Sequence, residues 1–225
     1  METTIRDRIA FVREHIERAA GGRDVVLVGV AKTKPAELVR EAVEAGLDAI
    51  GENYVQEFRE KSAAGAYEGA RVHIIGRLQK NKAKYVAGKA DLIQSVDSLA
   101  LMDELSRRAL ALNAVQDILL EVNIGGEAAK SGVDPDRLEE LLAGAGERPG
   151  IRVRGLMAIP PAENSIVYFP RMYHLYIDNK HKKYDNVIMD FLSMGMSADY
   201  EDAVKEGANM VRVGSIIFGP RNYTK

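Results

Sequence analysis

The 225-residue sequence contains no cysteine. This absence excludes disulfide bonds, a thiolate nucleophile and cysteine-ligated metals, and it suits a reducing compartment. Neither sign of charge prevails, because 31 basic residues stand against 33 acidic ones, for a formal net charge of −2. No overall positive field would hold the chain on nucleic acid or on an anionic membrane, so any anion site must be local.

Long apolar runs are also missing. The first 20 residues mix arginines with acidic residues and lack the uninterrupted apolar region of a signal peptide, and no later stretch approaches the length of a membrane span. We therefore expect a cytoplasmic protein that binds neither nucleic acid nor membrane. Apolar residues still make up 46% of the chain, enough for a sizeable buried core.

The apolar residues follow two periodicities. Ile5, Ile9, Val12 and Ile16 recur at helical spacing, and Gly21-Gly22 ends that pattern, which predicts an opening amphipathic helix. The run 25–31 is short, apolar and rich in β-branched residues, which is typical of a strand buried on both faces. Seven further candidate strands follow, at 48–51, 71–76, 91–95, 117–123, 152–157, 188–194 and 210–214.

Helical segments separate the candidate strands, for example 98–112 and 135–145, the latter opened by Asp134-Pro135. Eight strand–helix alternations favour an α/β fold with a single (β/α)8 barrel of the TIM type and an extra N-terminal helix, formed by residues 1–225 as one domain. A doubly wound open sheet would show the same alternation. The irregular stretch 160–187 is interpreted as a loop plus a solvated helix.

Barrel proteins carry their working residues at the C-terminal ends of the strands. The polar or small residues at those positions are Lys32, Asn53, His73, Arg77, Asn123, Ser197, Arg212, Gly214 and Ser215. Lys32 directly follows the first strand, where partial desolvation would lower the pKa of its amine and expose a nucleophile for carbonyl compounds. On position alone, an ordinary solvated lysine is the somewhat better interpretation, and Lys34 is a nearby competitor.

Two glycine- and serine-containing turns follow the seventh and eighth strands. They are Gly195-Met196-Ser197 and Gly214-Ser215, and phosphate sites in barrels are often built from these same two loops. Arg212 lies inside an apolar strand, so its guanidinium must meet either a structural ion pair or a bound ligand, such as a heterocyclic nitrogen.

The four histidines do not form a metal site. His73 lies within a strand and is interpreted as a satisfied core or rim residue, whereas His15, His174 and His181 are expected to be exposed. No cluster of His, Asp or Glu has ligand spacing, so we expect no bound metal. The lysines between residues 80 and 89 are interpreted as a solvated helix face that could also border the entrance of an anionic ligand.

Five segments together closely resemble the pyridoxal phosphate homeostasis proteins, which look like the N-terminal barrel of alanine racemases standing alone. They are Val-Ala-Lys-Thr-Lys-Pro (30–35), Gly-Glu-Asn-Tyr-Val-Gln-Glu (51–57), His-Ile-Ile-Gly-Arg-Leu-Gln-Lys-Asn-Lys (73–82), Leu-Ser-Met-Gly-Met-Ser-Ala-Asp (192–199) and Val-Arg-Val-Gly-Ser-Ile-Ile-Phe-Gly (211–219). The resemblance runs in order from about residue 5 to the C-terminus. It departs at Ala31, where the family often has serine, and it is loose over 162–187.

The resemblance implies that the cofactor is pyridoxal 5′-phosphate, bound as a covalent aldimine on Lys32. It further implies that Ser197, Gly214 and Ser215 hold the phosphate, that Arg212 faces the pyridine nitrogen, and that Asn53 lies beside the ring. An arginine at that nitrogen weakens the cofactor as an electron sink. A two-base racemase also needs a second proton-transfer group, which alanine racemases take from outside this barrel.

We therefore expect a protein that buffers and delivers the cofactor and is not an enzyme, with no catalytic residue and little or no amino-acid turnover. Candidate recipients are pyridoxal-phosphate-dependent apoenzymes, and the chain is expected to be a monomer or a weak homodimer. Two rival hypotheses remain: a racemase or Schiff-base lyase that uses Lys32, and a barrel that binds a phosphosugar without a covalent bond.

Overall fold

The computed structural model describes residues 3–127 and 129–220. Its strands are β1 (Val26–Val30), β2 (Ala49–Glu52), β3 (Arg71–Ile74), β4 (Leu92–Val96), β5 (Gln116–Val122), β6 (Ile151–Ala158), β7 (Val187–Met196) and β8 (Met210–Val213). Each strand pairs in parallel with the next, and β8 pairs with β1, so the sheet closes into a barrel. The predicted (β/α)8 barrel is confirmed, and the alternative of an open sheet is excluded.

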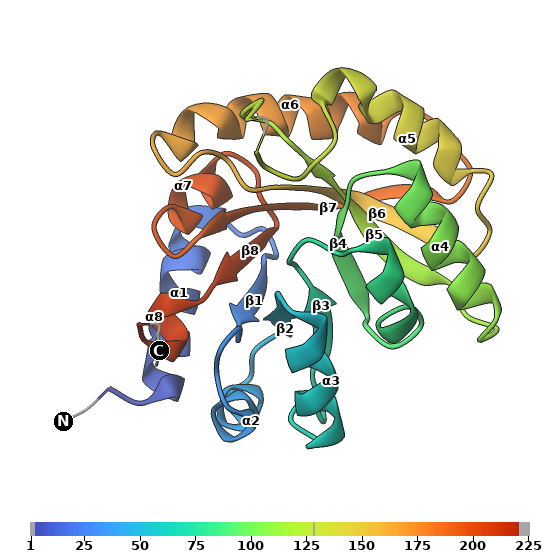
Figure 1. The fold of residues 1–225 in the computed structure, drawn as a ribbon. Helices are drawn as coiled ribbons and strands as arrows, with labels where there is room; N and C mark the ends of the chain where they lie inside the picture. Colours follow the sequence, from blue (N-terminus) through green and yellow to red (C-terminus); the bar gives the residue numbers. More distant parts are fainter. Residues whose placement is uncertain (1–2, 128, 221–225) are drawn as a thin grey trace.

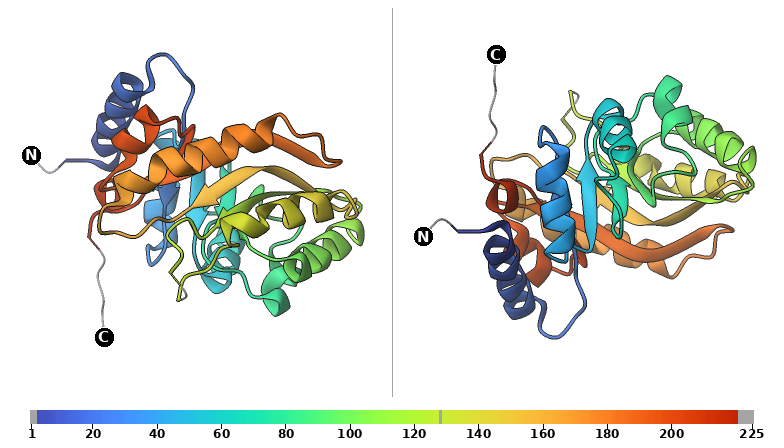
Figure 2. Two further views of the ribbon diagram at one scale, coloured as in Figure 1. Left: turned by 90° about the horizontal axis from the view of Figure 1, so that it is seen from above. Right: turned by 90° about the horizontal axis from the view of Figure 1, so that it is seen from below.

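Helices follow most strands and cover the outside of the barrel, as Figures 1 and 2 show. They are α1 (Ile5–Ala20), α2 (Ala36–Glu44), α3 (Val55–Ala63), α4 (Leu99–Leu110), α5 (Leu138–Ala145), α6 (Phe169–Lys180), α7 (Tyr200–Lys205) and α8 (Ser215–Phe218), with 3-10 turns η1 (Lys80–Tyr85), η2 (Pro135–Arg137) and η3 (Ser165–Tyr168). Within the described ranges, no helix is both long and apolar enough to cross a membrane.

The opening helix α1 forms as the sequence predicts. The Thr4 side chain accepts a hydrogen bond from the Asp7 amide while the Asp7 carboxylate accepts one from the Thr4 amide, a capping box that starts the helix. Gly21 ends it with a left-handed φ of 59°. The apolar face of α1 packs beside α7 and α8, which places this extra helix against the last two elements of the barrel.

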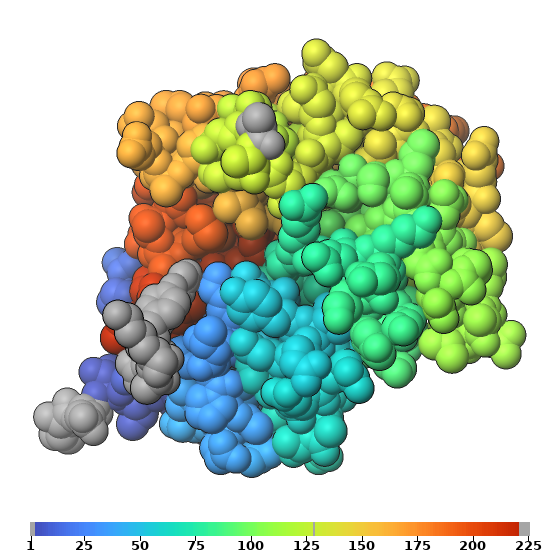
Figure 3. All heavy atoms as spheres, in the orientation of Figure 1, coloured from blue at the N-terminus to red at the C-terminus, as the bar shows by residue number. Residues whose placement is uncertain are grey.

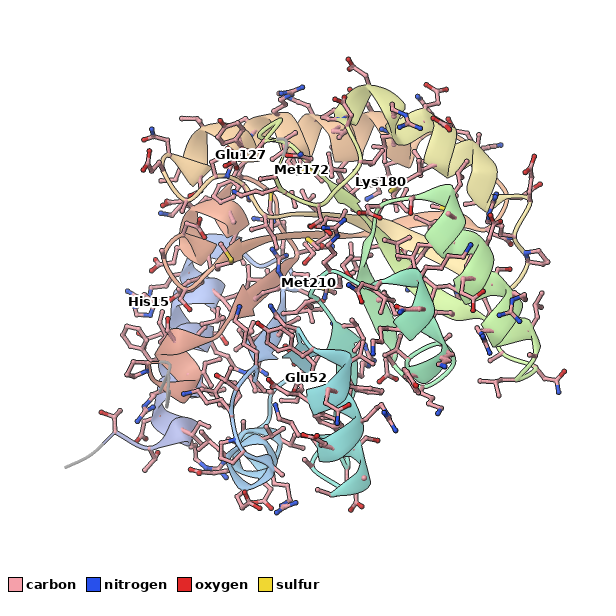
Figure 4. All side chains as sticks on the ribbon, viewed as in Figure 1. His15, Glu52, Glu127, Met172, Lys180 and Met210 are labelled. Atoms are coloured by element: carbon pink, nitrogen blue, oxygen red, sulfur yellow. The ribbon has the colours of Figure 1, made fainter. Side chains whose placement is uncertain are left out.

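Helix α6 corrects the interpretation of 160–187 as a loop plus a solvated helix. Phe169, Met172 and Tyr176 form a buried stripe on this helix, and the Tyr176 hydroxyl donates to the Met189 carbonyl at 2.8 Å. The polar residues between these three hide the stripe in the sequence. Met172, labelled in Figure 4, lies on the inner side of the helix, so α6 is a packed wall of the barrel.

The barrel interior has an apolar layer and a polar layer. The apolar layer consists of Val28, Ala49, Leu92, Leu119, Met157 and Met210. Two residues further along β4, β5 and β8 stand Gln94, Glu121 and Arg212, which point inward by the same alternation and are all buried. Buried polar groups therefore fill the barrel on the side where the strands end.

His73 is a core histidine that adjoins the polar layer. Its Nδ1 accepts a hydrogen bond from Gln94 Nε2 at 3.0 Å. Burial, helped by the positive charge of Arg71, lowers the pKa of His73 to about 3. Between about pH 6.5 and pH 3, the unfolded chain therefore binds a proton that the folded protein excludes.

We expect the free energy of unfolding to fall as the pH decreases through this window, and His73→Gln to remove that part of the dependence. The free energy of unfolding of the unchanged protein, relative to that of His73→Gln, should fall by about 2 kcal/mol from pH 6.5 to pH 5. The slope is about 1.4 kcal/mol per pH unit. Urea unfolding at the two pH values measures it. The buried carboxylates are common to both proteins and cancel in the comparison; parallel pH curves would show that His73 does not titrate as described.

Candidate functional site

The candidate residues come from one arc of the barrel. Strands β7, β8, β1 and β2 are consecutive neighbours in the barrel. A candidate residue follows each of them, in the order Ser197, Gly214, Lys32 and Asn53. Figure 1 shows β8, β1 and β2 side by side, and Figure 3 shows the surface hollowed near the centre of the same view. The sequence-predicted residues therefore share one mouth, although the chain separates them by up to 183 positions, from Lys32 to Ser215.

Lys32 stands two residues beyond Val30, in phase with Val28 of the inner core. The alternation of β1 thus continues toward the mouth, where Lys32 is half-buried. Lys34, the competing lysine, is otherwise engaged: its Nζ donates to the Pro220 carbonyl at 2.9 Å and to the Gly219 carbonyl at 3.4 Å. Of the two, Lys32 is the one whose position suits a ligand in the barrel.

An ion pair on α3, between buried Lys61 and half-buried Glu57, clamps the turn that carries Lys32. On one side of that lysine, Lys61 Nζ donates to the Ala31 carbonyl at 2.7 Å. On the other side, the Thr33 amide donates to Glu57 Oε2 at 2.7 Å, and Lys61 and Glu57 themselves are 3.1 Å apart. The backbone on both sides of Lys32 is therefore fixed by one pair of charges, which also holds Thr33 at a left-handed φ of 64°.

Lys61 has a second partner, Glu52, at 2.8 Å. The Glu52 carboxylate is fully buried and also accepts a hydrogen bond from the Tyr67 hydroxyl at 3.0 Å. Burial raises the pKa of Glu52, and the charge of Lys61 opposes that rise. Burial and the nearby Glu52 raise the pKa of Tyr67, which keeps its proton as a donor. Figure 4 places Glu52 inside the molecule, below Met210 in that view.

Arg212 ends a hydrogen-bond chain that crosses the barrel interior. Its Nη1 donates to Ser193 Oγ at 2.6 Å, and its Nη2 donates to the Ala158 carbonyl at 2.9 Å. Ser193 in turn donates to Gln94 Oε1 at 2.7 Å, and Gln94 donates to His73. These neutral partners fix the guanidinium without consuming all five of its N–H donors, so donors remain for a ligand. Burial lowers the pKa of Arg212 to about 10, which leaves it charged at neutral pH.

Glu121 is a buried carboxylate close enough to Arg212 for the two charges to interact. Ser131 donates to its Oε1 at 2.8 Å, but its buried Oε2 has no hydrogen-bond partner within the described part of the chain. Burial raises the pKa of Glu121, Asp97 raises it further, and Arg212 and Arg77 oppose the rise. A buried acceptor without a partner beside a charged donor is the kind of feature that a bound polar ligand satisfies.

The two predicted phosphate loops are joined directly. The Gly214 amide donates to Ser197 Oγ at 3.1 Å, and the Met196 amide donates to Asp199 Oδ1 at 2.7 Å, which fixes the turn after β7. Gly195 has a φ of 93°, and a Cβ there would lie 2.6 Å from that of Ala203, so only glycine fits. Ser215 is exposed at the start of α8. The pair of loops thus forms a rigid set of hydroxyl and amide donors.

Asn53 is held by an unusually close backbone contact. A Cβ at Gly76 would lie 2.4 Å from the Asn53 carbonyl oxygen, so glycine is required for the loop after β3 to pass the end of β2. Ser95 donates to the Gly76 carbonyl at 2.6 Å. Gly76 therefore brings Arg77 next to Asn53 at the rim of the mouth.

Other candidates from the sequence lie elsewhere. Asn123 bonds within its own loop, through Nδ2 to the Glu127 carbonyl at 2.9 Å. His174 and His181 are exposed, as expected, whereas His15 is half-buried, with Nδ1 2.8 Å from the Phe11 carbonyl oxygen; Figure 4 shows His15 at the edge of the molecule. Over the described residues, no group of three or more His, Cys, Asp or Glu side chains could hold a metal ion.

Sequence reasoning missed Glu52, Glu57, Lys61, Glu121 and Ser193. The sequence does indicate three of these positions, because a polar residue inside a run that is typical of a buried strand is unusual. They are Glu52, Glu121 and Ser193. Lys61 and Glu57 carried only an i, i+4 spacing on a polar helix, which exposed helices also show. Their importance appears only when α3 is packed against the turn after β1.

The fold and the site define a (β/α)8 barrel with a lysine, a pair of loops that carry hydroxyl and amide groups, and a buried arginine at its mouth. The model of the alanine racemase N-terminal domain family matches residues 3–222. Alanine racemase of Clostridium difficile 630 shares the fold, with a TM-score of 0.75 at 16% identity over 97% of this chain and 58% of that one.

More similar relatives narrow the class. The pyridoxal phosphate homeostasis protein of Aquifex aeolicus is 45% identical over 96% of this chain and 98% of its own, and that of Escherichia coli K12 is 38% identical over 98% of each. PipY of Synechococcus elongatus PCC7942, solved with PLP bound, superimposes with a TM-score of 0.85 at 33% identity over 96% of this chain and 100% of that one. This chain belongs to the pyridoxal phosphate homeostasis protein family, which confirms the resemblance seen in the sequence.

Proposed function

We propose that this protein binds pyridoxal 5′-phosphate covalently through Lys32 and serves intracellular homeostasis of the cofactor, by buffering it and delivering it to apoenzymes. The observation that carries the proposal is the convergence of Lys32, the Ser197–Gly214 loops and Arg212 on one arc of the mouth. When bound, the cofactor supplies an aldehyde that reacts with a primary amine and a ring that can accept electrons. The homeostasis relatives and the PLP-bound PipY support the same choice.

The residues present fit this group in charge and in hydrogen-bonding chemistry. Ser197, Ser215 and the backbone amides around Gly214 would hold the phosphate, since rigid hydroxyl and amide donors at two adjacent loops suit an anion. Arg212 would donate to the ring nitrogen with a remaining N–H group, and Asn53 would lie beside the ring. The clamp formed by Lys61 and Glu57 would hold the Lys32 amine toward the aldehyde carbon.

The charge of Arg212 favours a protein that carries the cofactor over an enzyme that uses the cofactor to transform amino acids. A guanidinium that stays charged at neutral pH disfavours a second positive charge on the ring nitrogen, so the ring accepts electrons less readily. We therefore propose that the protein is not an amino-acid racemase. Its cytoplasmic location and a monomeric or weakly dimeric state are part of the same proposal.

The rival with structural support is a pyridoxal-phosphate enzyme that acts on amino acids and uses Glu121 as an acid or base, because its pKa is raised by burial at the mouth. The two functions separate in one assay. Protein loaded with the cofactor and incubated in D2O should leave the α-protons of alanine, serine and threonine in place over hours. Exchange at enzymatic rates that Glu121→Gln abolishes would establish the rival instead.

Ser197→Ala tests the phosphate site. We expect affinity for pyridoxal 5′-phosphate to fall by about 10-fold to 100-fold, because a hydrogen bond to a charged group contributes about 1.5–3 kcal/mol. Affinity for pyridoxal, which lacks the phosphate, should stay within about twofold of that of the unchanged protein. Titration followed by visible absorption measures both constants, and an equal loss for the two ligands would place the phosphate elsewhere.

A further inference from the structure

A second cleft opens beside the candidate cofactor mouth. It has a volume of about 800 Å³ and lies between the start of α3, the loop after β3, η1 and the start of α4. Asn53 and Arg77 line it, so the rim of the mouth is also one wall of this cleft. We call it the Arg77 cleft. Its size is within the range of small-molecule sites.

The charges in the Arg77 cleft are mostly positive. Four cationic side chains line it, and they are Arg59, Arg77, Lys80 and Lys82. Asp97 is the one carboxylate in the lining. Within the described residues, none of the four cations has a carboxylate oxygen within 4.0 Å, although cations elsewhere, such as Arg152 with Asp117, are paired. In a chain of net charge −2, this is a local excess of unpaired positive charge.

The cations are held in place by an aromatic ring and by the backbone. The Arg59 guanidinium lies over the Tyr85 ring, 4.5 Å from its centroid. In a 3-10 helix, residues three apart are eclipsed, which places Lys82 of η1 beside the same ring at 6.0 Å. Cation–π contacts restrict both side chains without neutralising their charge. The cleft is therefore partly preorganised for an anion.

Arg77 links the cleft to the mouth through its charge. The tight contact between Gly76 and Asn53 fixes the backbone next to Arg77. The positive charge of Arg77 also acts on Glu121, where it opposes the rise in the pKa of that carboxylate. The sequence allows two interpretations of the lysines between residues 80 and 89: a solvated helix face, or the border of the entrance for an anionic ligand. Lys80 and Lys82 line the cleft, whereas Lys84 and Lys89 lie outside its lining.

We propose that the Arg77 cleft binds a phosphorylated small molecule as a second ligand, beside the candidate cofactor site, with which the cleft shares Asn53. Two arginine guanidinium groups and two lysine charges on a concave surface suit a phosphate dianion with a short body. The nearly balanced overall charge does not favour a nucleic-acid strand, which needs an extended basic track.

Calorimetric titration with glycerol 3-phosphate and with pyrophosphate tests this proposal, with glycerol as the uncharged control. Each titration is done on the untreated protein and on protein loaded with pyridoxal 5′-phosphate and reduced with borohydride. Binding in both samples is expected, because the reduced cofactor blocks the mouth and leaves the Arg77 cleft open. If the cofactor does not bind at all, the untreated sample alone still tests the cleft.

The decisive variants are Arg77→Gln/Lys80→Gln and the single Arg59→Gln, and the matched control is Lys89→Gln, an exposed lysine outside the lining. We expect the double variant to weaken binding of the phosphate probe at least about tenfold, Arg59→Gln to weaken it several-fold, and the control to stay within about twofold. Thermal melting confirms that each variant is folded. Unchanged binding in the double variant, loss of binding on borohydride reduction, or binding of a single-stranded oligonucleotide without binding of glycerol 3-phosphate would overturn the proposal.

Discussion

After incubation with pyridoxal 5′-phosphate and removal of the free cofactor, the Lys32→Ala variant is expected to lack the visible absorption band of the covalent adduct that the unchanged protein keeps. The reason is that Lys32 provides the amine at the mouth, in phase with the inner core and fixed on both sides by Lys61 and Glu57. Because the covalent bond needs that amine, its loss should be complete and not graded.

Lys34→Ala is the matched control for this prediction. Its amine already donates to the Pro220 and Gly219 carbonyls, so its removal should leave the visible band in place. A band that persists in Lys32→Ala and disappears in Lys34→Ala would transfer the covalent role to the second lysine. The phosphate loops do not depend on either side chain, so weak noncovalent binding to Lys32→Ala is expected to remain.

The second large effect is expected for Lys61→Met, which should lower the free energy of unfolding by about 3–5 kcal/mol. The substitution leaves the carboxylate of Glu52 buried without its counter-charge, and it removes the hydrogen bond to the Ala31 carbonyl. Urea unfolding at neutral pH measures the loss. The double variant Lys61→Met/Glu52→Gln should recover part of it, because the uncompensated buried charge is then gone.

Lys205→Met is the matched control for the buried pair. Lys205 is also 3.0 Å from a carboxylate, that of Asp202, but both side chains are exposed, so the change should cost at most about 1 kcal/mol. Equal losses for the two variants would mean that the burial of Lys61 contributes nothing. A large loss without recovery in the double variant would assign the effect to the Ala31 and Glu57 contacts.

Much of the fold is predictable from local pattern. The run 25–31 and the later apolar runs mark the strands because a barrel buries both faces of its sheet, and β1 to β8 fall within a few residues of their predicted positions. The helix predicted over 98–112 is less accurate at its end: the helix stops at Leu110, and Leu112 is exposed. Helix ends depend on what packs against them, which periodicity does not contain.

The candidate site divides in the same way. Lys32, Ser197 and Arg212 stand at or near strand ends, and the barrel rule finds such positions without knowledge of packing. The clamp around Lys32 is different, because Lys61 is 29 positions away and resembles an ordinary helix lysine. Its burial follows from how α3 meets the turn after β1, a tertiary contact that no local pattern encodes.

The pair Gln94 and Ser193 shows a third case. Each is a polar residue within a buried strand, visible in the sequence as an interruption of an apolar run. The partner of each cannot be read from the sequence, since they lie 99 positions apart and meet across the barrel. Closed topology supplies the contact that turns two isolated polar residues into support for Arg212.

The most direct test of the central proposal is borohydride reduction of the protein loaded with pyridoxal 5′-phosphate, followed by proteolysis and mass-spectrometric mapping of the modified lysine. We predict one modified residue, Lys32, at close to one cofactor per chain. Modification spread over exposed lysines such as Lys80, Lys84 and Lys89, or its absence from Lys32, would contradict the proposal that this lysine holds the cofactor at the barrel mouth.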